Sequence, residues 1–273
     1  MKKSNIKKIL AAVISIALVC GIVAMFASCG GNTEPEAEKQ KFIMGIDPEY
    51  PPFSYLGDDG EYTGFDVEVC KAACDYLGWD FEIFAVNWDN KLVQLDSKEC
   101  DCVWAGMTIL PSMTEAGYVI SKPYFDNTQV LVVKADSGLA SSKDLAGKDV
   151  AVQLGTSGES LLKGDLKESL ADTFNKVVTC DSFLKCFSEL EGGAVDAVFV
   201  DKPVADTYAA EHESVAVIDE DLGAEQYGIA FRSTDAELCK SIEDAVAVLV
   251  ENGTYAQIAE KYPEIQNNLL FLK

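Results

Sequence analysis

Short apolar runs alternate with helical segments along most of the chain, and this alternation is the strongest constraint on its fold. Apolar runs at residues 41–47, 80–88 and 100–107 are separated by segments at 64–79 and 89–99 that repeat apolar side chains at helical spacing. Strands and helices in this order form βαβαβ units, whose strands lie parallel and whose helices cover the sheet. The sequence therefore predicts a mostly parallel sheet from residues 41–107.

The alternation restarts after a long apolar strand at residues 124–134. Strands are predicted at 149–154, 175–180 and 194–201, and a second long strand at 225–233. The helices after that strand have no strands of their own to cover, so we expect them to pack back on the first sheet. The predicted fold class is α/β, with two lobes, each a mostly parallel sheet flanked by helices, joined by a two-strand hinge near residues 128–133 and 225–231. The expected boundaries place residues 42–129 and 228–273 in lobe 1 and residues 130–227 in lobe 2.

The chain is strongly acidic. Its 273 residues include 45 acidic and 22 basic side chains, which gives a formal net charge of −23. This charge argues against nucleic acid as a partner and against a basic face that docks on a membrane. His212 is the only histidine, which excludes any site that needs two histidines and leaves little room for a catalytic triad.

The first 28 residues have the order of an export signal, with basic residues, an uncharged apolar run and then small residues. The stretch FASC resembles the lipoprotein box of bacterial lipoproteins, in which the cysteine is lipidated; here that residue is Cys29, and Phe26 stands where leucine is more usual. The apolar run at residues 9–26 is also long enough for an uncleaved membrane anchor. Both alternatives hold the rest of the chain on the outer face of the cytoplasmic membrane. Residues 29–41 are polar and without periodicity, so we expect a flexible tether there.

Seven of the nine cysteines lie beyond residue 29. Cys70 and Cys74 are four residues apart on a predicted helix, a spacing poorly suited to a disulfide. No pair has the CxxC spacing of a zinc site. We therefore expect small buried thiols, with neither a metal nor a cofactor.

Seven ordered stretches resemble the solute-binding proteins of bacterial polar amino-acid ABC importers, the family 3 type. The opening stretch is GIDPEYPPFSYL followed by GEYTGFDVEV, and the later ones include DCVWAGMTI, KDLAGKDVAVQLGTSGE, DAVFVDKPVA, YGIAFR and NGTYAQIAEKY. The resemblance covers residues 42–265. It implies the periplasmic-binding-protein type II fold, in which two α/β lobes close over a ligand, as the alternation of elements also predicts.

Four predicted ligand contacts follow the first two strands. In open α/β sheets, ligands bind beyond the carboxyl ends of the strands. Asp47, Tyr50 and Phe53 lie just past the first strand, on a loop that two prolines stiffen, and Trp88 follows the next strand. The rings would present rigid apolar faces to a bound side chain; the alternative is that they belong to the core of the lobe.

The remaining predicted contacts follow later strands. The resemblance implies that Gly106 and Thr108 bind the ligand's α-amino or carboxylate group, and that Ser157 and Gly158 contact the ligand at the start of a helix. Free N–H groups at that helix start would form an anion-binding cradle. Asp201 ends a buried strand, where a carboxylate is costly unless it is paired, and the family uses this position to hold the α-amino group. The alternative role of Asp201 is to cap the next helix.

One family feature is missing. The family's arginine that grips the α-carboxylate lies about five residues after the threonine, where this chain has Met113. Arg232 is the only arginine, at a position that the family does not use for the ligand. Either the carboxylate rests on backbone N–H groups near Ser157 with Thr108 and Lys122, or the ligand is an amine that lacks a carboxylate.

The resemblance implies a monomeric, non-catalytic receptor that captures a small polar amino acid and delivers it to a membrane permease. The alternatives are a binding protein for an amine or another ligand without a carboxylate, and a dehydratase-like enzyme on the same scaffold. A dehydratase needs an acid and a base at the leaving group. The cleft offers Asp47, Asp201 and Glu159 for this purpose and no histidine, so we expect no enzyme.

Overall fold

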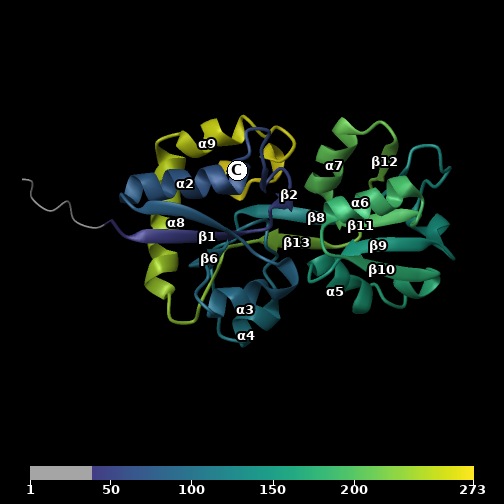
Figure 1. Cartoon of the computed structure of the whole chain (residues 1–273), viewed down its shortest axis with the longest axis horizontal. Coiled ribbons are helices and arrows are strands. Elements are labelled where there is room, and N and C mark those ends of the chain that lie inside the picture. Colours follow the sequence, from purple (N-terminus) through teal and green to yellow (C-terminus); the bar gives the residue numbers. More distant parts are fainter. Residues whose placement is uncertain (1–38) are drawn as a thin grey trace, which may run out of the picture. The chain divides into compact units, whose positions relative to one another are not determined.

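The computed structural model describes residues 39–273 (Figure 1). The predicted signal peptide, the lipidation site at Cys29 and the tether up to residue 38 lie outside the described residues. Strand β1 begins at Lys41, the last residue of the expected tether. Within residues 39–273, no helix combines the length and apolar character that crossing a bilayer requires.

The first sheet has the strand order β5-β1-β6-β14-β7. Strand β1 runs parallel to β5 and β6, as the alternation of elements predicts, whereas β14 runs antiparallel to β6 and β7. Its strands are β1 (Lys41–Ile46), β5 (Asp80–Ala85), β6 (Cys102–Val103), β7 (Val119–Ile120) and β14 (Ala230–Phe231). This sheet and the helices on it form the first lobe.

Helix α2 covers the first sheet with one apolar face. Val69, Cys70 and Ala73 on that face are fully buried, and Gly78 ends the helix in a left-handed conformation, with φ of 71°. Helix α8, in the last part of the chain, packs against α2, which confirms that the final helices return to the first sheet (Figure 1). The helices of this lobe are α2 (Phe65–Leu77), η1 (Trp88–Asn90), α3 (Lys91–Asp96), α4 (Pro111–Glu115), α8 (Ala236–Glu251), α9 (Thr254–Ala259), η4 (Gln266–Asn268) and η5 (Leu270–Leu272).

The second sheet has the order β10-β9-β11-β8-β12, and β13 pairs with the beginning of β8. Strands β9, β10 and β11 are parallel, while β8 runs antiparallel to β11, β12 and β13. Its strands are β8 (Phe125–Lys134), β9 (Asp149–Gln153), β10 (Lys176–Cys180), β11 (Ala197–Asp201), β12 (Val215–Ile218) and β13 (Ala224–Tyr227). The helices of this second lobe are η2 (Ser142–Leu145), α5 (Ser157–Lys163), η3 (Ala171–Thr173), α6 (Phe183–Gly192) and α7 (Lys202–Glu211).

The chain passes between the two sheets twice. The first passage follows β7 and ends where β8 begins at Phe125, so the stretch 128–133 lies inside the second sheet rather than between the sheets. The second predicted long strand is wrong as a single strand, because it is divided into β13 and β14. A Cβ atom on Gly228 would lie 2.8 Å from the Ile109 side chain, so a larger residue here would require that side chain to move. The lobe boundaries after residues 129 and 227 stay a prediction.

All seven cysteines within residues 39–273 are free and buried, as the sequence predicts. Within the same residues, no three His, Cys, Asp or Glu side chains converge as a metal ion would need.

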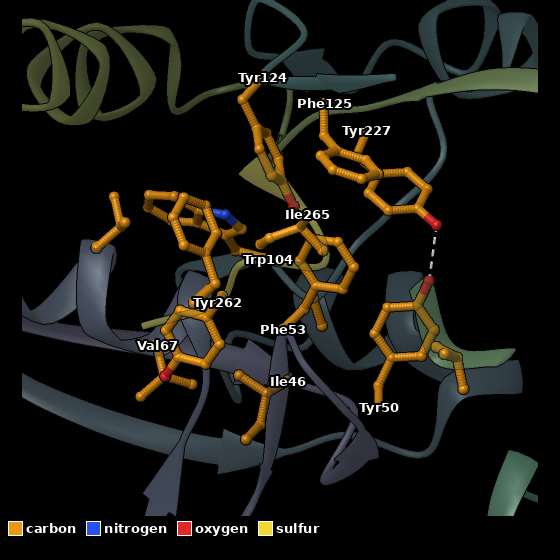
Figure 2. Close-up of a cluster of buried hydrophobic side chains, with 14 of the residues drawn as sticks. Ile46, Tyr50, Phe53, Val67, Trp104, Tyr124, Phe125, Tyr227, Tyr262 and Ile265 are labelled. Carbon is orange, nitrogen blue, oxygen red and sulfur yellow. Dashed lines mark hydrogen bonds between the residues drawn. The ribbon is translucent and has the colours of Figure 1, made fainter. Parts of the chain in front are cut away.

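Aromatic rings fill the junction between the lobes (Figure 2). A small sheet of β2 (Glu49–Tyr50), β3 (Ser54–Leu56) and β4 (Tyr62–Thr63) carries Tyr50 and Phe53. The Phe53 ring meets the edges or faces of Tyr50, Phe125 and Tyr227, with centroids 5.2–5.6 Å apart. Because Phe125 and Tyr227 belong to the two passages, this cluster fixes both passages to the loop that follows β1.

We expect Phe53→Ala to lower the free energy of unfolding by about 3–5 kcal/mol, because it leaves a cavity in the centre of this cluster. Urea denaturation measures the change. Tyr76→Ala is the control, since that ring is 57% exposed. A loss for Phe53→Ala no larger than for the control would contradict a core role for this ring.

Candidate functional site

The candidate site is a cavity between the lobes, at the carboxyl ends of strands from both sheets. It is lined by Tyr50, Trp88, Lys91, Gly106, Met107, Thr108, Leu110, Met113, Gly155, Thr156, Ser157 and Asp201. These residues follow β1, β5 and β6 in the first lobe and follow or end β9 and β11 in the second. Two α/β halves therefore meet with their ligand-binding edges face to face.

Six of the nine predicted contacts line this cavity: Tyr50, Trp88, Gly106, Thr108, Ser157 and Asp201. Asp47, Phe53 and Gly158 do not line it. Phe53 lies behind Tyr50 in the aromatic cluster, and Gly158 is buried in α5 next to Gln129 and Phe199. The binding roles of all nine residues remain predictions, and the packing of Phe53 and Gly158 favours a structural role for these two.

Asp47 bridges the lobes from a buried position. Its carboxylate accepts hydrogen bonds from the Gln153 side chain of the second lobe, at 2.8 Å, and from the backbone N–H of Glu49, at 3.0 Å. Burial raises the pKa of this carboxyl above its ordinary range, although both hydrogen bonds oppose the shift.

Two expected backbone donors are already engaged. The N–H of Gly106 donates to Asp66 at 2.8 Å, and the N–H of Glu159 donates to the Thr156 hydroxyl that caps α5. Asp66 is completely buried, and burial raises its pKa to about 7. Gly106 has φ of 55°, and a Cβ there would lie 2.3 Å from the Tyr50 ring, so glycine is needed for this ring to reach the cavity.

Asp201 is the centre of a polar network at the junction. Its Oδ1 accepts hydrogen bonds from the side chains of Asn127 and Gln129, both at 2.6 Å, and from the Tyr227 hydroxyl at 3.0 Å. The Tyr50 hydroxyl lies 2.8 Å from that of Tyr227 (Figure 2). Because Tyr227 gives its hydrogen to Asp201, Tyr50 is the donor in this second bond. Three neutral donors therefore orient this carboxylate, and within residues 39–273 no lysine or arginine lies within 4.0 Å of it.

A second carboxylate, Glu225, joins this network, and sequence reasoning missed it. Glu225 accepts hydrogen bonds from the same two amides, at 2.7 Å from Asn127 and 3.0 Å from Gln129. Burial raises its pKa to about 8, and the neighbouring charge of Asp201 adds to the shift. Polar Asn127 and Gln129, two residues apart in a buried strand, were the available signal, because they share one face of β8.

Lys91 was also missed. It is the one cationic side chain among the residues that line the cavity. Its Nζ donates to the backbone oxygens of Trp88, at 3.0 Å, and Gly155, at 2.8 Å, so it connects the two lobes. No pattern in the sequence indicated this role, because a lysine near the start of a predicted helix is usually solvated.

The other candidate cations lie elsewhere. Arg232 pairs with Asp101 and Asp235 and donates to backbone oxygens of Leu95 and Cys100, a structural role in the first lobe. Lys122, an expected helper at the carboxylate, lines a different cavity beside α8. Met113 itself lines the cleft, and no arginine is among the residues that line it.

The lobes are close together in this structure. A Cβ on Gly155 would lie only 2.6 Å from the Cα of Asp89 in the opposite lobe. The cavity measures about 30 Å³, room for about two water molecules. A ligand as large as an amino acid therefore enters only if the lobes separate.

Three larger hollows lie away from the cavity at Asp201. One, of about 290 Å³, is lined mainly by apolar residues of α8 and its neighbours, and another is a broad groove of about 1210 Å³ between the β2–β4 region and helices α6 and α7. The third, of about 400 Å³, is lined by Lys134, Glu191 and their neighbours. None of these three is lined by Asp201, so chemistry and topology favour the small cavity as the binding site.

We expect the free energy of unfolding to fall as pH rises from about 4.5 to about 8, because the folded protein keeps the Glu225 proton that the unfolded chain releases near 4.5. Glu225→Gln should remove this component. Urea denaturation across this range measures the free energy of unfolding of both proteins. Asp66 contributes to the pH dependence of both, so the difference between the two pH slopes reports Glu225. Equal slopes would show that Glu225 ionises normally.

Comparisons with known proteins identify the family and the fold of this chain. Residues 42–265 match the bacterial extracellular solute-binding proteins, family 3. The chain is 31% identical to the L-cystine-binding protein TcyJ of Escherichia coli (strain K12) over 259 residues, 94% of this chain and 95% of that protein. It is 32% identical to the arginine-binding extracellular protein ArtP of Bacillus subtilis (strain 168) over 246 residues, 89% of this chain and 94% of that protein.

A solved structure has the same architecture. The substrate-binding protein of an ABC uptake transporter from Streptococcus pneumoniae, with bound histidine, superposes with a TM-score of 0.77 at 26% identity and covers 81% of this chain and 92% of its own. The expected α/β fold of periplasmic binding proteins of type II is confirmed. The chain belongs to the bacterial extracellular solute-binding proteins, family 3.

Proposed function

We propose that this protein captures a small polar amino acid between its lobes and delivers it to the permease of an ABC importer. The observation that carries the proposal is the Asp201–Glu225 pair at the cleft. Because the raised pKa of Glu225 keeps it protonated at neutral pH, the pair carries one negative charge, which is costly in a buried site without a cation partner. A ligand ammonium would compensate this charge, and relatives that bind cystine, arginine and histidine support an amino acid as its source.

Two aromatic rings line the space that we propose for the ligand's side chain. Tyr50 and Trp88 line the same cavity as Asp201, from the opposite lobe. A ligand held by its ammonium group would extend between the two rings as the lobes close. The proposed lobes are residues 42–129 with 228–273, and residues 130–227, and they move about the two passages near the aromatic cluster.

The site supports binding rather than catalysis. Asp201 and Glu225 accept from the same two amides and therefore lie together, so they offer no acid and base on opposite sides of a leaving group. We therefore propose a monomeric receptor that uses no cofactor. An amine that lacks a carboxylate is the alternative ligand, since Met113 occupies the position of the expected arginine.

A thermal-shift screen against amino acids tests the proposal. A ligand at about 100 times its Kd should stabilise the protein by about 2.7 kcal/mol. Stabilisation by amines alone would favour the alternative ligand class. Turnover of any stabilising compound would contradict the receptor.

We expect Asp201→Asn to weaken binding of the stabilising amino acid by about a hundredfold or more, because it leaves the ligand's ammonium without its charge partner, at a cost of about 3–5 kcal/mol. Calorimetric titration measures the loss. Asp172→Ala is the control, since Asp172 forms an exposed pair with Lys167. A loss below about threefold, on the scale of a surface charge, would refute the role of Asp201.

We further propose that residues 1–28 are a signal peptide and that lipidated Cys29 anchors the protein to the outer face of the cytoplasmic membrane. Cys29→Ala should move the exported protein from the membrane fraction to the soluble fraction, because it removes the lipidated thiol. Immunoblots of fractionated cells measure this, with Cys20→Ala as the control. If both variants fractionate like the wild type, the lipid anchor is excluded.

A further inference from the structure

Lys91 is held at the cleft without a salt-bridge partner among residues 39–273. Its Nζ lies 4.5 Å from the centre of the Trp88 ring and donates to two backbone oxygens, one from each lobe. Within residues 39–273, no carboxylate lies within 4.0 Å of it, and it belongs to none of the ion pairs there. An ammonium group has three N–H donors, so one remains for another partner.

The carboxylates whose charges act on Lys91 form no ion pair with it. Asp89 is exposed, Asp47 accepts from Gln153 and Glu49, and Glu159 pairs with Lys163 at 2.7 Å. Burial lowers the pKa of Lys91 to about 8, although the charges of Asp89, Asp47 and Glu159 oppose the shift. An anion in the cleft would compensate this charge.

The cavity therefore carries charges of both signs, and neither has an ion-pair partner within 4.0 Å among residues 39–273. Asp201, with Glu225 beside it, supplies the negative charge from the second lobe, and Lys91 supplies the positive charge from the first. A ligand with an ammonium and a carboxylate would satisfy both, whereas an amine would leave Lys91 without a partner.

We propose that Lys91 binds the carboxylate of the ligand, in place of the arginine that Met113 replaces. This inference rests on the proposed function and narrows the ligand to zwitterions. Lysine offers a point charge rather than the two-pronged fork of arginine, so the carboxylate is held by one hydrogen bond and its position is less restricted. A carboxylate on the ligand's side chain would suit Lys91 as well as an α-carboxylate.

The test compares amino acids with their decarboxylated amines. Calorimetry measures L-arginine against agmatine, L-histidine against histamine and L-cystine against cystamine, for the wild type, Lys91→Met and Lys91→Arg. A charged hydrogen bond in the cleft should make the wild type prefer at least one acid over its amine by about tenfold or more. Lys91→Met should lose this preference, and Lys91→Arg should keep part of it.

The ratio of acid to amine affinity separates recognition from a mechanical role. If Lys91 only joined the lobes through Gly155, Lys91→Met would weaken acid and amine equally, and the unchanged ratio would overturn the inference while the proposed function stands. A wild type that binds none of the six compounds would overturn the function and the inference together, as would one that prefers the amines. Lys122→Met, outside the cleft, should leave the ratio unchanged.

Discussion

The hydrogen-bonded network around Asp201 is the interaction on which the site depends. Asn127 and Gln129 reach Asp201 from β8, Tyr227 reaches it from the end of β13, and Tyr50 joins from the opposite lobe. The carboxylate therefore lies where both passages of the chain and the loop after β1 come together. A movement of the lobes would change the surroundings of this charge, which would couple the proposed ligand binding to closure.

The same junction explains why buried polar groups and aromatic rings occur together. Phe53, Phe125 and Tyr227 fix the passages by packing (Figure 2). The Tyr227 hydroxyl donates to the Asp201 carboxylate. A buried polar network is stable only when its members are satisfied. Here the amide oxygens of Asn127 and Gln129 have no donor within residues 39–273, so a ligand ammonium would complete the network as well as neutralise it.

Much of the fold could be predicted from the sequence, because the apolar periods of α2, β1 and β9 reflect local packing. The predicted single strand at residues 225–233 failed at Gly228, where a crowded passage, invisible in the pattern, divides it. Most predicted contacts follow strand ends and line one cavity. Glu225 and Lys91 could not be found in this way, because each is placed at the site by a partner far away in the sequence. Glu225 lies beside Asp201, and Lys91 donates to Gly155.

The central claim is that the cleft binds an amino acid through charges of both signs. A crystal structure of the protein with its preferred amino acid tests this claim most directly. We predict a closed cleft in which the ligand's ammonium contacts Asp201, its carboxylate contacts Lys91, and its side chain lies between Tyr50 and Trp88. A ligand bound in the apolar cavity beside α8, or one whose carboxylate contacts neither Lys91 nor any other cation, would contradict the account.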